Sequence, residues 1–156
     1  MSISPQQFEL LLPTAVEWAK EQEAIVLQSG EPLNPEELVY AQKIGVLHPE
    51  KVRLLKVSAM PQPTNPFLRQ AADLTGLLGP GTAGLTLRYA IFIRNDHYRQ
   101  LRLVVHELAH THQYERMGGF EPFLRQYLFE CLTAIYPNGA LEQEVLRKEQ
   151  EFFGPR

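Results

Sequence analysis

The chain has a single cysteine, Cys131, among its 156 residues. One cysteine cannot form a disulfide within the chain, and it cannot build a zinc site of the cysteine-rich kind. A lone thiol fits a reducing compartment, so a cytoplasmic location is the expectation. We expect the Cys131 side chain to lie in the hydrophobic core.

Long apolar runs and early basic residues are also lacking. No stretch reaches the ~18 uncharged apolar residues that a membrane-spanning helix requires. The longest uncharged stretch, residues 74–87, is interrupted by glycine and proline. The first 19 residues contain no Lys or Arg, and Pro13 interrupts the early apolar run. We therefore expect neither a membrane span nor a secretory signal peptide.

Acidic and basic residues are concentrated in different segments of the chain, although the net charge is only -3. Residues 1–50 carry 2 basic and 8 acidic groups, and residues 51–106 carry 8 basic and 2 acidic groups. The basic residues of the middle segment stand singly between apolar residues and form no dense face, so nucleic-acid binding is not expected. We expect either that the acidic N-terminal helices lie near the basic central segment or that both charged faces are simply solvated.

Length and composition favour one domain. Hydrophobic residues make up 44% of the chain and charged residues 21%, enough to build one core in a chain of this length. We predict a single α+β domain over residues 1–156, with a small sheet packed on helices. Within it, residues 1–48 form an N-terminal helical region, and residues 49–156 contain the sheet and the core of the site.

Capping residues and hydrophobic spacing predict six helices and two strands. The helices are expected at residues 4–30, 34–45, 65–75, 95–117, 122–136 and 138–153, and Pro13 is expected to kink or restart the first. The strands are expected at residues 51–59 and 84–94. Segment 84–94 is the clearest strand, because apolar side chains alternate from Leu85 to Ile93 along one face.

The sequence His106-Glu107-Leu108-Ala109-His110 is an HExxH motif inside a predicted helix. Residues four apart stack on one helix face, so both imidazoles can bind one Zn²⁺ and Glu107 can contact the water that the zinc activates. The flanking residues are apolar on nearly every side, which predicts a buried helix. Buried imidazoles and a carboxylate need hydrogen bonds or a metal, and core histidines bonded to carbonyls are the alternative explanation.

A catalytic zinc needs a third protein ligand and one position for water. His112 lies two residues after His110 and turns to the far side of the helix, so it is not expected to bind the same ion. Glu130 follows His110 by 20 residues but is expected to face water. In the last helix Glu142 shares the apolar face, whereas Glu144 shares the charged face. We therefore predict Glu142 as the third ligand, with Glu130 and Glu144 as alternatives.

The motif, followed by the helical Glu142-Gln-Glu-Val145, resembles the gluzincin branch of zinc metallopeptidases, and in particular the small single-domain minigluzincins. The last two thirds of the chain also look like an uncharacterised bacterial family. The resemblance implies a zincin-like domain with a central HExxH helix, whose preceding strand, here residues 84–94, pairs with an extended substrate. Two positions depart from the pattern. Val145 stands where a small residue is usual, and Leu146 stands where Asp or Asn often follows.

The implied function is a zinc-dependent metallopeptidase. Zinc held by His106, His110 and Glu142 would activate a water, and Glu107 would act as the general base on a peptide or protein substrate. Candidate donors to the oxyanion are Tyr114, Tyr127, Tyr136, Arg88 and His112. The alternative is a catalytically inactive zinc-binding module with a structural or regulatory role. The sequence does not indicate the oligomeric state.

Overall fold

The computed structural model describes residues 3–134 and 138–156. Its helices are α1 (Pro5–Ser29), α2 (Pro35–Ile44), α3 (Pro66–Thr75), α4 (Leu101–Met117), α5 (Phe120–Thr133) and α6 (Ala140–Phe153). Its strands are β1 (Glu31–Pro32), β2 (Arg53–Val57), β3 (Gly84–Leu87) and β4 (Ala90–Arg94). The predicted α+β class is confirmed for these residues, in which six helices surround one small sheet.

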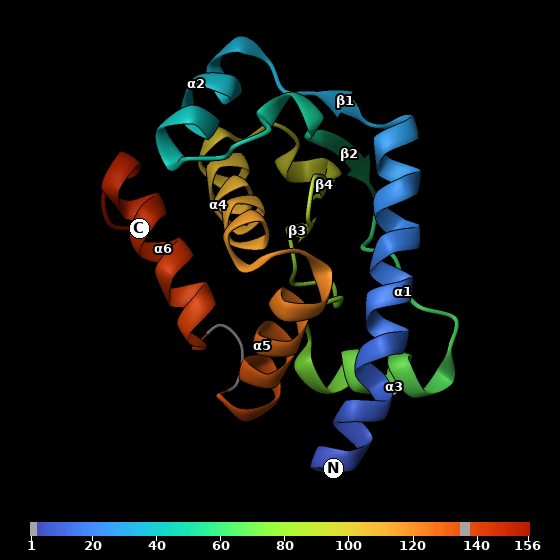
Figure 1. The fold of residues 1–156 in the computed structure, drawn as a ribbon. Coiled ribbons are helices and arrows are strands. Elements are labelled where there is room, and N and C mark those ends of the chain that lie inside the picture. The colour runs from blue at the N-terminus through green and yellow to red at the C-terminus, as the bar shows by residue number, and fades with distance from the viewer. Residues whose placement is uncertain (1–2, 135–137) are drawn as a thin grey trace.

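The sheet has the strand order β1-β2-β4-β3, so β3 lies at one edge. Strands β2 and β4 are parallel, and the other two pairs are antiparallel. Figure 1 shows α1 on one side of the sheet and α4 on the other. Leu85 and Leu87 pack in the core cluster that contains α1, whereas Ile91 and Ile93 pack with residues of α2 and α4. The sheet therefore separates two parts of the core.

The predicted single strand over residues 84–94 is wrong, because the chain reverses at Arg88 and Tyr89 to form the β3–β4 hairpin. Arg88 takes a positive φ of 60°, which a residue with a side chain adopts at a cost. The buried Glu23 of α1 accepts hydrogen bonds from Arg88 Nε at 2.8 Å and from the Tyr89 N–H at 3.1 Å. The Thr111 hydroxyl donates to the Arg88 carbonyl at 2.7 Å. These bonds stabilise a turn that the alternating sequence does not reveal.

The helix boundaries also differ from the prediction in places. Helix α1 continues through Pro13, which is solvent-exposed, and is neither ended nor restarted there. A short 3-10 turn at Asn95–His97 precedes α4, so this helix begins at Leu101 and not at residue 95. Helix α4 ends at Gly118 and α5 begins at Phe120, before the expected Pro122. The expected end of α5 at Tyr136 lies outside the described residues.

Ion pairs join the acidic N-terminal helices to the basic central segment, in agreement with one of the two predicted arrangements. Glu23 of α1 pairs with Arg88 at 2.6 Å, and Glu37 of α2 pairs with Arg99 at 2.5 Å. Cys131 is buried, as also predicted. Within the described residues, none of the helices combines the length and the apolar composition needed to cross a bilayer.

Candidate metal centre

The HExxH residues lie in the middle of α4, the most enclosed helix of the fold. Val104, Val105 and Leu108 have no exposed surface and pack against the sheet and α2. This packing fixes α4 and buries the polar residues between these side chains. His106, Glu107 and His110 are exposed by only 7%, 4% and 5%.

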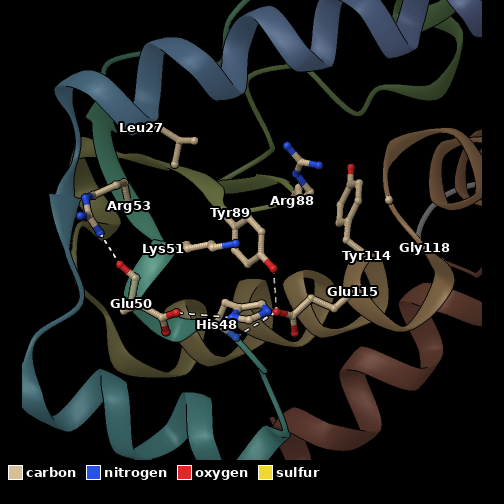
Figure 2. A pocket seen from close by; sticks show the side chains of 11 residues that line it. Leu27, His48, Glu50, Lys51, Arg53, Arg88, Tyr89, Tyr114, Glu115 and Gly118 are labelled. Atoms are coloured by element: carbon tan, nitrogen blue, oxygen red, sulfur yellow. Dashed lines mark hydrogen bonds and ion pairs between the residues drawn. The ribbon is translucent and has the colours of Figure 1, made fainter.

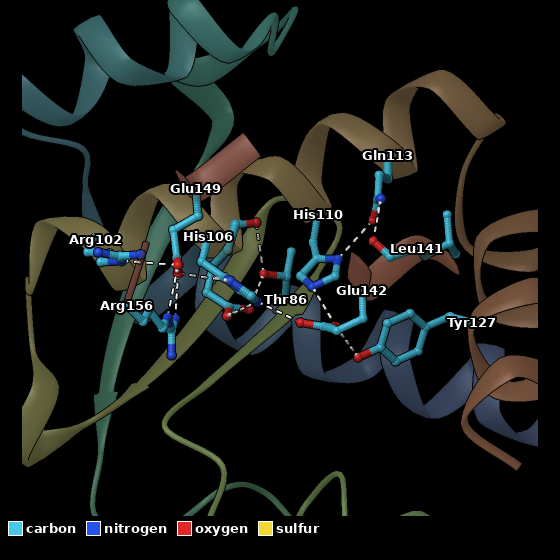
Figure 3. Close-up of polar contacts among 11 residues, drawn as sticks. Thr86, Arg102, His106, His110, Gln113, Tyr127, Leu141, Glu142, Glu149 and Arg156 are labelled. Atoms are coloured by element: carbon cyan, nitrogen blue, oxygen red, sulfur yellow. Dashed lines mark hydrogen bonds and ion pairs between the residues drawn. The ribbon is translucent and has the colours of Figure 1, made fainter. Parts of the chain in front are cut away.

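Helix α6 brings Glu142 beside both histidines. Its neighbours Leu141 and Val145 are buried in the core, so the helix face that carries Glu142 is turned inward. Glu142 Oε1 lies 2.7 Å from His106 Nε2, and Glu142 Oε2 lies 3.1 Å from His110 Nε2 (Figure 3). Ligand atoms from the three side chains all lie within 4.8 Å of one another. The three predicted zinc ligands therefore converge at one point.

The alternative third ligands lie elsewhere. Glu130, which was expected to face water, is half-buried and accepts a hydrogen bond from the Leu141 N–H at 2.9 Å, at the start of α6. Glu144 bonds to Gln113 and to Arg116 at the surface. Each carboxylate thus has a structural partner, and neither belongs to the cluster of described residues that could hold a metal ion.

Glu149, two turns along α6 from Glu142 on the same helix face, contacts the other side of His106. Its Oε1 lies 3.3 Å from His106 Nδ1, and Arg102 and Arg156 donate to the same carboxylate. Burial disfavours ionised Glu149, but bonds to these three side chains outweigh burial and hold its pKa well below the usual range. An ionised carboxylate can only accept a hydrogen bond. In this contact the hydrogen is therefore on His106 Nδ1, and Nε2 faces Glu142.

A comparable bond orients His110. Its Nδ1 lies 2.9 Å from Gln113 Oε1. The amide nitrogen of Gln113 donates to the Leu141 carbonyl at 2.9 Å and to Glu144 at 2.8 Å, which fixes the amide orientation and turns its oxygen toward His110. His110 must therefore donate from Nδ1, and its Nε2 faces Glu142.

The carboxylates around His106 favour positive charge at the cluster. Burial lowers the pKa of His106, but hydrogen bonds to Glu142 and Glu149 outweigh it and raise that pKa to about 10. Burial opposes ionisation of Glu142, yet the bonds with His106 and His110 hold its pKa well below the usual range. In this structure a proton on His106 balances the carboxylates. A divalent metal ion supplies positive charge at the same place.

The donor set fits zinc. Two imidazole nitrogens and one carboxylate are typical ligands of catalytic zinc, which takes them at ~2.0–2.2 Å. A tetrahedral site with such bonds spaces its ligand atoms roughly 3.3 Å apart. The nitrogen-to-oxygen distances of 2.7 and 3.1 Å at Glu142 are close to this spacing. A small outward movement of Glu142 would therefore suit this ion.

The Glu107 side chain extends from α4 and lies between strand β3 and His106. The Thr86 hydroxyl lies 2.8 Å from Glu107 Oε1, and Glu107 Oε2 lies 3.9 Å from His106 Nε2. Gly84 makes room for this carboxylate, because a Cβ at that position would lie 2.9 Å from Glu107 Oε2. Strand β3 thus positions the predicted general base in two ways. The Thr86 hydroxyl is hydrogen-bonded to it, and Gly84 has no side chain that would displace it.

Of the predicted oxyanion donors that the structure describes, Tyr127 is hydrogen-bonded to the cluster. Its hydroxyl donates to Glu142 Oε2 at 2.9 Å, and its ring packs edge-on against His110. The Tyr114 hydroxyl donates to the Thr86 carbonyl at 3.3 Å, and the His112 ring lies toward Gly45 at the end of α2. Tyr136 lies outside the described residues.

Arg88, the remaining candidate donor, lines a separate open hollow of about 740 Å³ (Figure 2). Its guanidinium is committed to Glu23 at 2.6 Å. In the same hollow Glu115 accepts hydrogen bonds from the Tyr89 hydroxyl at 2.8 Å and from the Leu47 N–H at 2.8 Å. Arg88 and Glu115 therefore already have hydrogen-bond partners in this structure.

The cavity at the cluster is small. It has a volume of about 40 Å³, and Phe123, Leu124 and Tyr127 of α5 contribute to its lining. Roughly 10–15 Å³ of such space holds one water molecule. The cavity in this conformation therefore holds a few waters but no peptide.

Sequence reasoning missed the roles of Glu149, Gln113, Thr86 and Gly84. Two of these had a signal in the helix period: Glu149 follows Glu142 by seven residues, and Gln113 follows His106 by seven, so each shares a face with a predicted ligand. Thr86 and Gly84 had none, because their roles depend on how β3 packs against α4.

Comparisons with known proteins give no independent indication of function. No protein-family model matches the sequence, and neither a curated protein nor a solved structure is significantly similar to it. The geometry of the cluster is therefore the main indication of what the protein does.

Proposed function

We propose that the protein is a zinc-dependent metallopeptidase of zincin-like architecture, with zinc held by His106, His110 and Glu142. The single observation that carries the proposal is the buried contact of the Glu142 carboxylate with both histidine Nε2 atoms, at 2.7 and 3.1 Å. Glu149 and Gln113 support it, because they hold both imidazoles in the tautomer that directs Nε2 inward.

A bound zinc ion lowers the pKa of a coordinated water to near 7 and polarises a substrate carbonyl. The role of Glu107 is to accept the proton of the attacking water and to deliver it to the leaving amine nitrogen. Thr86 fixes one oxygen of Glu107 at 2.8 Å, which leaves the other oxygen for proton transfer. Tyr127 can donate its hydroxyl to the developing oxyanion if it releases Glu142.

The edge of β3 supports a peptide substrate. The Arg94 N–H donates to the Ala83 carbonyl at 2.9 Å, so this pair is a hydrogen-bonded one. Hydrogen-bonded and non-hydrogen-bonded pairs alternate along an antiparallel ladder. Gly84 and Thr86 belong to non-hydrogen-bonded pairs, so their backbone N–H and C=O groups point away from β4. An extended peptide can add to such an edge as a further strand beside Glu107 once the Tyr114 hydroxyl, which donates to the Thr86 carbonyl at 3.3 Å, releases it. The resemblance to gluzincins implies the same arrangement.

The departure from the gluzincin pattern at position 146 has a counterpart in the structure. Leu146 offers no polar atom where Asp or Asn often follows, but the Glu149 carboxylate approaches His106 Nδ1 at 3.3 Å from the next turn of α6. The carboxylate that orients a metal-binding histidine is thus supplied by another residue of the same helix.

Hydrolysis of a fluorogenic peptide library by the zinc-loaded chain tests the proposal. We expect cleavage by the wild type and a loss of at least ~100-fold in the Glu107→Gln variant, which keeps the zinc ligands. A matched control is Glu115→Gln, a carboxylate two turns along α4 and bonded outside the cluster. Equal cleavage by wild type and Glu107→Gln would remove Glu107 from the mechanism.

A second candidate is a zinc-binding module without peptidase activity. Two observations favour it: the cavity of about 40 Å³ admits no peptide, and Tyr127 donates to Glu142 at 2.9 Å. Peptidase activity requires α5 to move away from the edge of β3. Gly118 and Gly119, both at positive φ, join α4 to α5 and are the natural pivot.

The two candidates differ in whether α5 opens. Hydrogen exchange of α5 amides in the zinc-loaded chain, with and without a hydroxamate peptide analogue, measures that opening. A peptidase is expected to show exchange of α5 well above that of α4, with protection by the analogue. Uniformly slow exchange in both helices, together with bound zinc and no cleavage, favours the module.

A further inference from the structure

Glu149, the carboxylate behind His106, is itself held by two guanidinium groups. Arg102 of α4 donates from Nε to Glu149 Oε2 at 3.0 Å. Arg156, three residues after the end of α6, donates to both carboxylate oxygens, from Nε to Oε2 at 2.9 Å and from Nη2 to Oε1 at 2.5 Å (Figure 3). The Glu149 side chain has no exposed surface, so protein atoms surround it.

The two arginines hold this carboxylate in different ways. The oxygen that faces His106 Nδ1, at 3.3 Å, is Glu149 Oε1. Arg102 donates to the other oxygen, whereas Arg156 bonds to both through the two-pronged contact that arginine makes with carboxylates. Because one planar guanidinium fixes both oxygens, the carboxylate cannot rotate without breaking both bonds. Arg156 therefore keeps Oε1 directed at His106.

The chain turns back after α6, which places Arg156 beside this carboxylate. Gly154 has a φ of 78°, a backbone conformation that favours glycine. Arg102 Nη2 donates to the Gly154 carbonyl at 2.7 Å. Just before the turn, the Phe153 ring stacks on Tyr40 of α2, with the ring centroids 5.6 Å apart. The turn is thus anchored on both α2 and α4.

We propose that Arg156 is a positioning residue of the metal centre, whose guanidinium holds Glu149 against His106 and thereby orients the imidazole that binds zinc. The inference rests on the proposed function for the zinc, whereas the contact between Arg156 and Glu149 does not involve the metal. A carboxylate bonded to a metal-binding histidine contributes roughly 10- to 100-fold to metal affinity, and a group that fixes this carboxylate contributes part of that effect. Residues 154–156 therefore belong to the metal centre, although they supply no ligand to it.

Exchange of the His106 Nδ1 proton with solvent measures this positioning. Proton NMR of the zinc-loaded chain, or of the metal-free chain if zinc does not bind, detects this proton, and its loss in His106→Ala assigns the signal. We expect exchange to be at least tenfold faster in Arg156→Gln than in the wild type, because Glu149 Oε1 is then no longer fixed. Arg156→Lys keeps the charge but not the two-pronged contact, and it is expected to recover part of the protection. The control is Arg147→Gln, the same change at an exposed position of α6, which is expected to leave exchange unchanged.

Zinc affinity provides the second measurement. The Arg156 side chain is 60% exposed, so its variants are expected to fold. Competition with a chromophoric chelator is expected to show about tenfold weaker binding in Arg156→Gln and unchanged binding in Arg147→Gln. Equal proton exchange in the wild type and Arg156→Gln would overturn the inference, as would equal zinc affinities. A wild type that binds no zinc contradicts the proposed function alone, and proton exchange then decides whether Arg156 positions His106.

Discussion

His106 Nδ1 and Glu149 Oε1 lie 3.3 Å apart, on the side of the imidazole opposite Glu142. This contact orients a predicted zinc ligand through a residue that does not itself reach the metal position. We predict that Glu149→Gln, which keeps the shape but removes the charge, weakens zinc binding about 10- to 100-fold. Competition with a chromophoric chelator measures the affinity, and the exposed Glu151→Gln on the same helix is the control. Equal affinities for wild type and Glu149→Gln would contradict this role.

Gly84 is predicted to matter for hydrolysis more than for zinc binding. A Cβ at residue 84 would lie 2.9 Å from Glu107 Oε2 and would displace the carboxylate. Gly84→Ala is therefore expected to keep about one zinc per chain and to lower cleavage at least tenfold. Gly81→Ala is the matched control, because nothing lies within 4 Å of a Cβ at that glycine. Unchanged cleavage by Gly84→Ala would show that Glu107 tolerates the displacement.

Glu23 is predicted to stabilise the β3–β4 turn. The carboxylate is 4% exposed and bonds to Arg88 and to the Tyr89 N–H, so its removal leaves both without this acceptor. Because the Arg88 side chain is 40% exposed, water screens part of the effect. We expect Glu23→Ala to lower the free energy of unfolding by about 2 kcal/mol. Urea denaturation measures it, with the exposed Glu21→Ala as the control, and a difference below ~0.5 kcal/mol between the variants would refute the assignment.

Cys131 is predicted to react slowly in the folded chain. Burial, together with the charges of Glu142 and Glu130, raises the pKa of its thiol to about 12. Thiolate is the reactive form, so at pH 8 alkylation should be at least ~100-fold slower than in denatured chain, whose thiol has a pKa near 8.5. The native rate should rise about tenfold per pH unit between pH 8 and 10. Iodoacetamide labelling followed by mass spectrometry tests both statements, and equal native and denatured rates would contradict the buried position.

The helix period accounts for much of what the sequence predicts. It indicates that His106, Glu107 and His110 are buried, and it favours Glu142 over Glu144 because the former shares the apolar face. Both inferences depend on contacts within single helices, and the exposed fractions of these residues agree with them. The cap residue Asn34, with Pro35 after it, likewise predicts the start of α2, because this signal too is local.

What the sequence does not reveal depends on contacts between distant segments. The alternation from Leu85 to Ile93 continues through the turn, and the turn itself is stabilised by Glu23, which lies 65 residues before Arg88. Strand β1 is two residues long and contains a proline, so it is too short to show the alternation of polar and apolar residues that would predict a strand. The bonds from Glu149 to His106 and from Thr86 to Glu107 likewise require knowledge of how α6 and β3 pack on α4.

The central claim is tested most directly by the zinc content of the purified chain, measured by elemental analysis after removal of loosely bound ions. The variants are His110→Ala and Glu142→Ala, with Glu144→Ala and Glu130→Ala as controls for the alternative ligands. About one zinc is expected in the wild type and in both controls, and its loss is expected from His110→Ala and Glu142→Ala. A folded wild type that takes up no added zinc would contradict the account and would leave His106 and His110 as core residues.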